Sequence, residues 1–111
     1  MENKMNNQDS LLNMTKFNLI DVIVLSELNW RTSHGYGIYW RVQHLILGAM
    51  KVNMSSIYKS LYRLAENGCI IEVRLVRKQR EYQITQLGYE RLNRDIRLLE
   101  RVIHGSLASK Q

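Results

Sequence analysis

The fold of this chain is decided by the stretch SIYKSLYRL at residues 56–64. Its apolar residues Ile57, Leu61 and Leu64 fall on one face of a helical wheel, and its aromatic and basic residues fall mainly on the other. An asparagine before the stretch and an Asn-Gly pair after it are typical of helix ends, so the pattern predicts a helix over about residues 54–67. One face of this helix is suited to a core, and the other is left for a partner.

Helical periodicity before this stretch predicts two more helices. Apolar residues on most sides predict a largely buried helix over about residues 15–28. A second helix is expected over about 34–47, with Ser33 as its N-cap and Gly48 at its end. Its inward stripe is predicted to consist of Ile38, Val42 and Leu45.

After the central helix, the period changes to that of strands. Apolar and polar residues alternate over 71–76 and over 82–84, and the loop at 77–79 joins the two segments into a hairpin. Thr85 is placed to cap a final helix over about 86–104. The chain is therefore predicted to be mainly α with a small β-hairpin. The order α-α-α-β-β-α is that of a winged helix-turn-helix with a long C-terminal dimerisation helix.

One domain is expected to account for most of the chain. Its 111 residues are enough for one modest core and too few for an additional catalytic domain. The asparagine-rich residues 1–13 are expected to form a flexible N-terminal arm, and residues 105–111 a disordered tail. The winged-helix domain is predicted to span 14–104, with the dimerisation helix at 86–104.

Composition favours a polyanionic partner and a reducing compartment. The formal net charge is +6 and the pI is about 9.7, which favours nucleic acid or an anionic surface. Cys69 is the single cysteine, so no intrachain disulfide can form. No apolar run reaches the length of a membrane span, and no signal peptide is visible. A cytoplasmic protein with no membrane partner is therefore expected.

The outward face of the central helix and the basic hairpin are together predicted to bind double-stranded DNA. The major groove admits a helix that carries short polar and basic side chains, and flanking cations bind the phosphates. The predicted contacts on the helix are Asn53, Ser55, Ser56, Tyr58, Lys59, Tyr62 and Arg63, and those on the hairpin are Arg74, Arg77, Lys78 and Arg80.

A dimer interface is predicted along the final helix. Apolar residues recur there at spacings of four, three and four, which is the seam that one helix offers another. The predicted interface residues are Phe17, Leu92, Ile96, Leu99 and Ile103. Packing on the first helix of the same chain is the alternative use of this stripe, and both can hold.

An enzyme is not indicated. The three histidines are scattered, the single cysteine has no ligand spacing around it, and no phosphate-binding loop or nucleophile motif occurs. No cofactor or metal is therefore expected. Trp30 and Trp40 invite a site for a small flat aromatic effector, although scattered surface aromatics are common.

Three blocks of sequence resemble the PadR-like family of winged-helix transcription regulators. They are HGYGI at 34–38, IYKSLYRLAENGCI at 57–70 and YQITQLG at 82–88. The resemblance implies a homodimer that is joined largely through its terminal helices and binds a near-palindromic operator, usually as a repressor. It places helix 54–67 in the major groove and the wing 74–82 on the phosphate backbone. Some small relatives bind flat aromatic compounds between subunits.

The chain departs from the family pattern in the central helix. Family members often carry Pro-Gly before this helix and a proline after its tyrosine, where this chain has Met54-Ser55 and Lys59. Base specificity therefore does not carry over. The sequence also allows two other functions. One is a winged-helix protein-interaction adaptor, and the other is an architectural or replication-linked DNA-binding protein.

Overall fold

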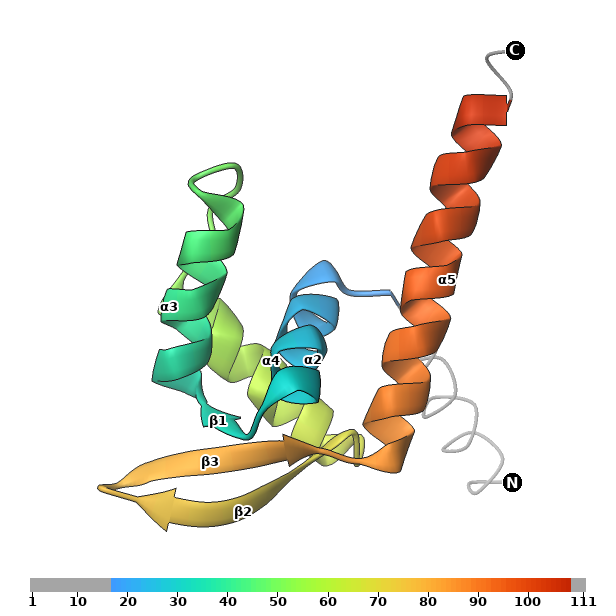
Figure 1. Cartoon of the computed structure of the whole chain (residues 1–111). Helices are drawn as coiled ribbons and strands as arrows, with labels where there is room; N and C mark the ends of the chain where they lie inside the picture. Colours follow the sequence, from blue (N-terminus) through green and yellow to red (C-terminus); the bar gives the residue numbers. More distant parts are fainter. Residues whose placement is uncertain (1–16, 109–111) are drawn as a thin grey trace, which may run out of the picture.

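The computed structural model of this protein describes residues 17–108 and confirms the expected mainly α, winged-helix architecture (Figure 1). Three helices lie on one side of a small sheet, and a long helix follows the sheet. In chain order the elements are α2 (Leu19–Trp30), β1 (Ser33–His34), α3 (Gly35–Ile46), α4 (Met54–Glu66), β2 (Ile70–Val76), β3 (Gln79–Ile84) and α5 (Gln86–Ala108).

The chain ends differ in part from those expected. The arm expected at 1–13 lies outside the described residues, as do 109–111 of the expected tail. Residues 105–108, also expected in the tail, are the last four residues of α5. At 23 residues, this helix is about 34 Å long.

The sheet has a third strand that periodicity did not predict. The strand order is β1-β3-β2, and β1 pairs antiparallel with β3 through Ser33 opposite Tyr82 and His34 opposite Glu81. A strand of two residues carries no alternation to recognise. The β1–β3 pairing joins the hairpin to the start of α3. The hairpin is also connected to α4 through the start of β2.

A β-bulge in β2 sets the register of the hairpin. Glu72 lies opposite Tyr82, but Arg74 lies opposite Glu81, so one extra residue is accommodated between them. Without the bulge Arg74 would face Arg80, and directly opposed like charges destabilise a strand pair. The shifted register shortens the loop from the expected 77–79 to two residues.

His34, and not the predicted Ser33, caps α3. The Nδ1 atom of His34 accepts a hydrogen bond from the backbone N–H of Gly37 at 3.1 Å. Ser33 is already part of β1, and its hydroxyl instead accepts a hydrogen bond from Arg41 at 2.7 Å. Sequence reasoning chose serine because histidine is an unusual cap.

The other expected caps are confirmed. Asn53 caps α4 and Thr85 caps the first turn of α5, the latter by accepting a hydrogen bond from the N–H of Gly88 at 3.1 Å. Thr85 also donates its hydroxyl proton to the carbonyl of Gly68 at 2.7 Å. A Cβ on Gly88 would lie 2.0 Å from the carbonyl oxygen of Cys69, so only glycine allows α5 to start this close to the end of α4.

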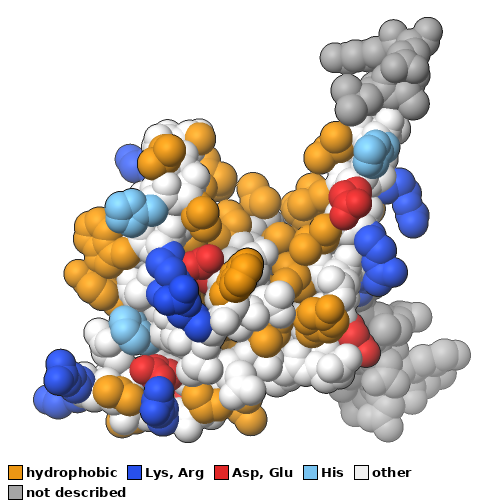
Figure 2. Space-filling model, viewed as in Figure 1, with side chains coloured by type: hydrophobic (Ala, Val, Ile, Leu, Met, Phe, Trp, Pro, Cys, Tyr) orange, Lys and Arg blue, Asp and Glu red, His pale blue; other side chains and the backbone are white. Residues whose placement is uncertain are grey.

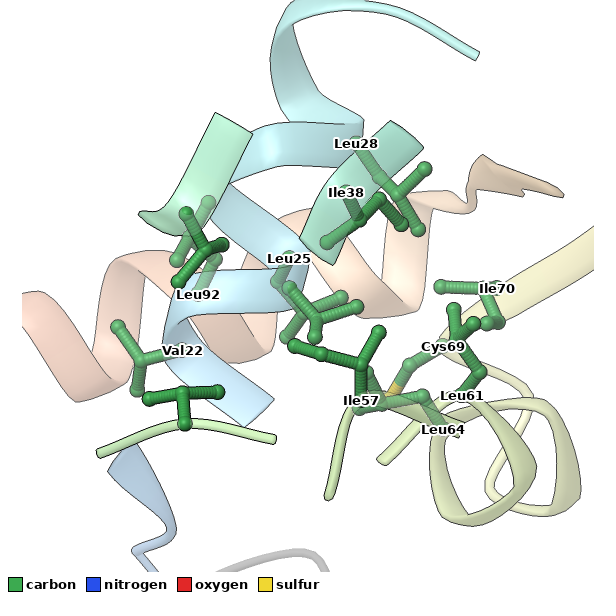
Figure 3. Packing of buried hydrophobic residues seen from close by; sticks show 13 residues of the cluster. Val22, Leu25, Leu28, Ile38, Ile57, Leu61, Leu64, Cys69, Ile70 and Leu92 are labelled. Carbon is green, nitrogen blue, oxygen red and sulfur yellow. The ribbon is translucent and has the colours of Figure 1, made fainter. Parts of the chain in front are cut away.

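The core lies where α2, α3, α4 and the first residue of β2 converge, and α5 closes it (Figure 3). Leu25, Ile38, Ile57 and Leu64 are fully buried there. Cys69 is buried and free, as expected for a small apolar side chain. The prediction that Ile38, Val42 and Leu45 of α3 face inward is wrong for Leu45, which is 69 % exposed.

Candidate nucleic-acid interface

Helix α4 has the two faces that its sequence predicted. Ile57, Leu61 and Leu64 are buried, whereas Tyr58, Lys59 and Tyr62 are exposed. The two tyrosines expose 51 % and 69 % of their surface. The helix is therefore held by one face and presents the other to solvent.

The first turn of α4 is ordered by Asn53. Its Oδ1 accepts hydrogen bonds from the backbone N–H of Ser56 at 2.8 Å, the hydroxyl of Ser55 at 2.8 Å and the hydroxyl of Ser56 at 2.9 Å. Both serine hydroxyl protons are therefore committed within the chain. Towards a partner, these two hydroxyl oxygens act as acceptors.

A buried carboxylate fixes the orientation of α4. Asp21 of α2 is 1 % exposed and accepts hydrogen bonds from the Ser60 hydroxyl at 2.6 Å and from Arg63 at 2.6 Å, both on α4. Arg63, expected to contact DNA, thus directs its guanidinium at α2. A buried charge is tolerated only when it is paired in this way.

The same carboxylate joins α4 to α5. Arg91 of α5 is 4 % exposed and donates to Asp21 at 3.0 Å. One turn further on, Asp95 is also buried and lies 3.8 Å from Arg91 and 3.6 Å from Arg94. Burial raises the pKa of the Asp95 carboxyl above its ordinary value, and the neighbouring Arg94 and Arg91 guanidinium groups oppose that rise. We call Asp21, Ser60, Arg63, Arg91 and Asp95 the charged junction.

Sequence reasoning missed the charged junction, although one signal for it was present. Helix α2 is apolar on most sides, so Asp21 and Glu27 within it had to be buried with partners. Glu27 has the corresponding partner in Arg41 of α3, at 2.6 Å. The sequence shows that such partners are needed but not which of the many arginines supply them.

The hairpin presents its free cations at the tip. Arg77 and Lys78 form the two-residue loop with φ values of 50° and 66°, the left-handed pair that a type I′ turn requires. Both side chains are exposed and form no ion pair with any residue in the described range 17–108. Figure 2 shows basic side chains at this end of the hairpin.

The remaining two basic residues of the wing have acidic partners. Arg74 binds Glu81 at 2.7 Å, and Arg80 lies 3.5 Å from Glu72. Both arginines are about two-thirds exposed, so these pairs restrain the side chains without burying them.

The wing and α4 border two neighbouring hollows that share lining residues. Tyr58 and Tyr82 line a hollow of about 330 Å³ together with Lys78 and Arg80 from the wing. They also line a neighbouring hollow of about 540 Å³ that reaches Tyr62. The wing tip is therefore on the same side of the molecule as the outer face of α4.

The predicted dimer residues divide between the core and the surface. Leu92 is 3 % exposed and belongs to the core of its own chain, so it is not available to a partner. Ile96 and Ile103 are 37 % and 56 % exposed, Leu99 is half-buried, and Phe17 is 36 % exposed. The C-terminal half of α5 extends away from the other elements (Figure 1).

Trp30 and Trp40 lie at the surface on different helices. Trp30 ends α2 and is 83 % exposed. Trp40 on α3 is 49 % exposed and makes edge-to-face contacts with Tyr36 and Tyr39, at centroid distances of 6.2 and 5.4 Å. The hollows described above are lined by other residues.

Membrane-spanning helices and metal-binding clusters are both absent from the described residues. No helix within the described residues is long and apolar enough to cross a membrane. Within the same part of the chain, no group of three or more His, Cys, Asp or Glu residues is arranged to hold a metal ion.

A helix with a solvent-exposed outer face beside a basic hairpin defines the winged-helix class of DNA-binding proteins. The chain belongs to the transcriptional regulator PadR-like family, whose model matches residues 24–94. It is therefore a DNA-binding transcriptional regulator, as the resemblance implied. Among proteins with curated functions, none matches its sequence.

Solved structures agree with this assignment. A transcriptional regulator from Clostridium thermocellum is 26 % identical, with a TM-score of 0.66 over 78 % of this chain and 87 % of that one. A PadR family transcription regulator from Clostridium difficile has the same fold at 19 % identity, with a TM-score of 0.65 over 81 % of this chain and 99 % of that one.

Proposed function

We propose that this protein binds a specific, near-palindromic DNA operator as a homodimer and represses transcription there. Helix α4 enters the major groove, and the wing, residues 74–82, lies on the phosphate backbone. The single observation that carries this proposal is that Tyr58 on the outer face of α4 and Lys78 at the wing tip line the same hollow. Repression follows if the bound dimer covers DNA that the transcription machinery needs.

Three cations supply most of the proposed attraction to phosphate. Lys59, Arg77 and Lys78 are exposed and have no acidic partner among residues 17–108. Asn53, Ser55 and Ser56 add polar groups at the first turn of α4, where helix N–H groups also favour an anion. Arg74 and Arg80 can turn from their exposed acidic partners towards phosphate, at a small cost.

The second copy of the chain is proposed to pack on the far half of α5. Ile96, Val102 and Ile103 expose apolar surface there that their own chain leaves uncovered, and Leu99 lies between them along the helix. Phe17 at the start of the described chain adds to this apolar surface. Pairing of two such helices buries the stripes and sets the spacing of the two α4 helices on DNA.

A binding selection from random duplexes, followed by footprinting, tests the DNA proposal. We expect one discrete palindrome, with affinity falling by orders of magnitude between about 50 and 200 mM salt. Lys59→Ala should weaken binding and flatten the salt dependence, whereas Arg101→Ala on α5 should do neither. Broad protection would instead favour an architectural protein, and no DNA binding at low salt would favour an adaptor.

Sedimentation of two interface variants tests the dimer proposal. Ile96→Asp or Ile103→Asp places a charge in the proposed apolar contact and should give a monomer. Leu45→Asp is the matched control, because Leu45 is an apolar residue on α3 that is more exposed than either isoleucine. Variants of α5 that remain dimeric would place the interface elsewhere.

Two smaller proposals accompany this function. The protein works in the cytoplasm, where a repressor reaches its DNA. A flat aromatic effector would use the ring cluster around Trp40, which offers edges and faces for stacking. Quenching of tryptophan fluorescence by such a compound in the wild type, and its loss in Tyr36→Ala, would support the site.

A further inference from the structure

The outer face of α4 is poor in the side chains that usually read bases by hydrogen bonds. Arginine and lysine are the common readers of guanine, and asparagine and glutamine are the common readers of adenine. No asparagine or glutamine occurs within α4, and Arg63 has one terminal nitrogen bonded to Asp21 while its Nε atom is buried. Lys59 is exposed and is the cation of this helix that pairs with no acidic residue among residues 17–108.

The largest groups that remain on this face are two aromatic rings. Tyr58 and Tyr62 are four residues apart, so they lie on one side of the helix in successive turns. The shallow hollow between them, lined also by Lys59 and Arg63, is almost wholly apolar. A groove-facing surface of this kind favours an apolar group on the DNA.

The ring of Tyr58 is held in place by the helix before it. A Cβ on Gly35 would lie 2.7 Å from Cε1 of this ring, so the ring packs directly against the glycine. Any larger side chain at position 35 would push the ring outward. Tyr58 is thus a positioned group, whereas Tyr62, at 69 % exposure, projects further into solvent.

Thymine supplies the apolar group that this surface fits. Its C5 methyl is the one apolar substituent that the four standard bases display in the major groove. On the basis of the proposed function, we infer that Tyr58 and Tyr62 read thymine methyl groups and that this contact is the main source of base specificity from α4. Burying one methyl group corresponds to about a fourfold gain in affinity.

Replacement of single thymines by deoxyuridine in the selected operator tests this inference, because it removes only the methyl group. For the wild type, we expect about a fourfold loss of affinity at one or two thymines in each half-site and no loss elsewhere. Tyr62→Ala should bind thymine and uracil versions of its contacted position equally. Tyr62→Phe should still distinguish them, because the ring and not the hydroxyl makes the contact.

The possible failures are distinguishable. If the wild type binds its operator specifically but tolerates uracil at every position, methyl readout is wrong and the proposed function stands. If Tyr62→Phe loses the discrimination along with Tyr62→Ala, the hydroxyl is the reader and the inference is also wrong. If no duplex is bound specifically, the proposed function itself fails. Circular dichroism of each variant checks that the exposed substitution leaves the fold intact.

Discussion

Basic side chains have opposite surroundings in the charged junction and at the wing tip. In the charged junction Arg63 and Arg91 converge on one buried carboxylate, Asp21, and hold three helices together. At the wing tip, Arg77 and Lys78 are exposed on a strained turn and have no partner among the described residues. Net charge therefore does not measure the charge available to DNA, because some cations are paired with buried carboxylates inside the domain.

The largest effect should come from breaking the charged junction. Arg91→Met removes one of the cations that neutralise buried Asp21, and we expect a loss of about 3–5 kcal/mol in the free energy of unfolding. Arg97→Met on the same helix is the control, since Arg97 is exposed and its removal should cost less than about 0.5 kcal/mol. Urea denaturation of both variants measures the two losses in the free energy of unfolding. Equal losses would show that the arginine of the charged junction contributes no more to stability than an exposed arginine.

Neutralising the wing tip should affect DNA binding and leave stability nearly unchanged. In the double variant Arg77→Gln, Lys78→Gln, each lost phosphate contact should reduce the slope of log K against log salt by about 0.9. Fluorescence anisotropy with the selected operator, measured over a salt series, gives this slope. An unchanged slope would mean that the tip does not touch phosphate.

Relieving the strain of the turn should raise stability while weakening binding. Asparagine followed by glycine is the favoured pair for a type I′ turn, so Arg77→Asn, Lys78→Gly should gain about 1 kcal/mol of folding stability. The same change removes both tip cations and should lower affinity for DNA. Thermal unfolding and anisotropy on one sample test both halves, and a loss of stability would show that the present turn is not strained.

The smallest effect should appear in the pH dependence of the junction. Because the folded pKa of Asp95 is raised, the folded state holds this proton to higher pH than the unfolded chain does. Its contribution to stability therefore falls as the pH rises above about 4. Asp95→Asn should lack this fall and be at least as stable as the wild type at pH 7. Denaturation midpoints between pH 4 and 7 measure the difference, and parallel curves would contradict it.

Sequence reasoning performed best where a pattern is local. The two faces of α4, the caps at Asn53 and Thr85, and the long final helix follow from spacing and capping preference, and the structure confirms them. The family resemblance followed from three such local blocks.

The features that were missed depend on contacts between distant residues. The partnership of Asp21 with Arg91 spans 70 positions, and the two residues of β1 become a strand only because β3 lies beside them. Leu92 continues the apolar period of α5, but periodicity cannot say where the domain's own core ends and an exposed stripe begins. These outcomes required the three-dimensional structure.

The outer face of α4 and the wing tip are proposed to form one DNA-binding surface. An NMR titration of the full chain with its selected duplex tests it most directly. We expect the largest shifts at Lys59, Tyr62, Arg77 and Lys78, with little change in the aromatic cluster around Trp40. Shifts confined to that cluster, or to only one of the two elements, would show that α4 and the wing tip do not bind DNA together.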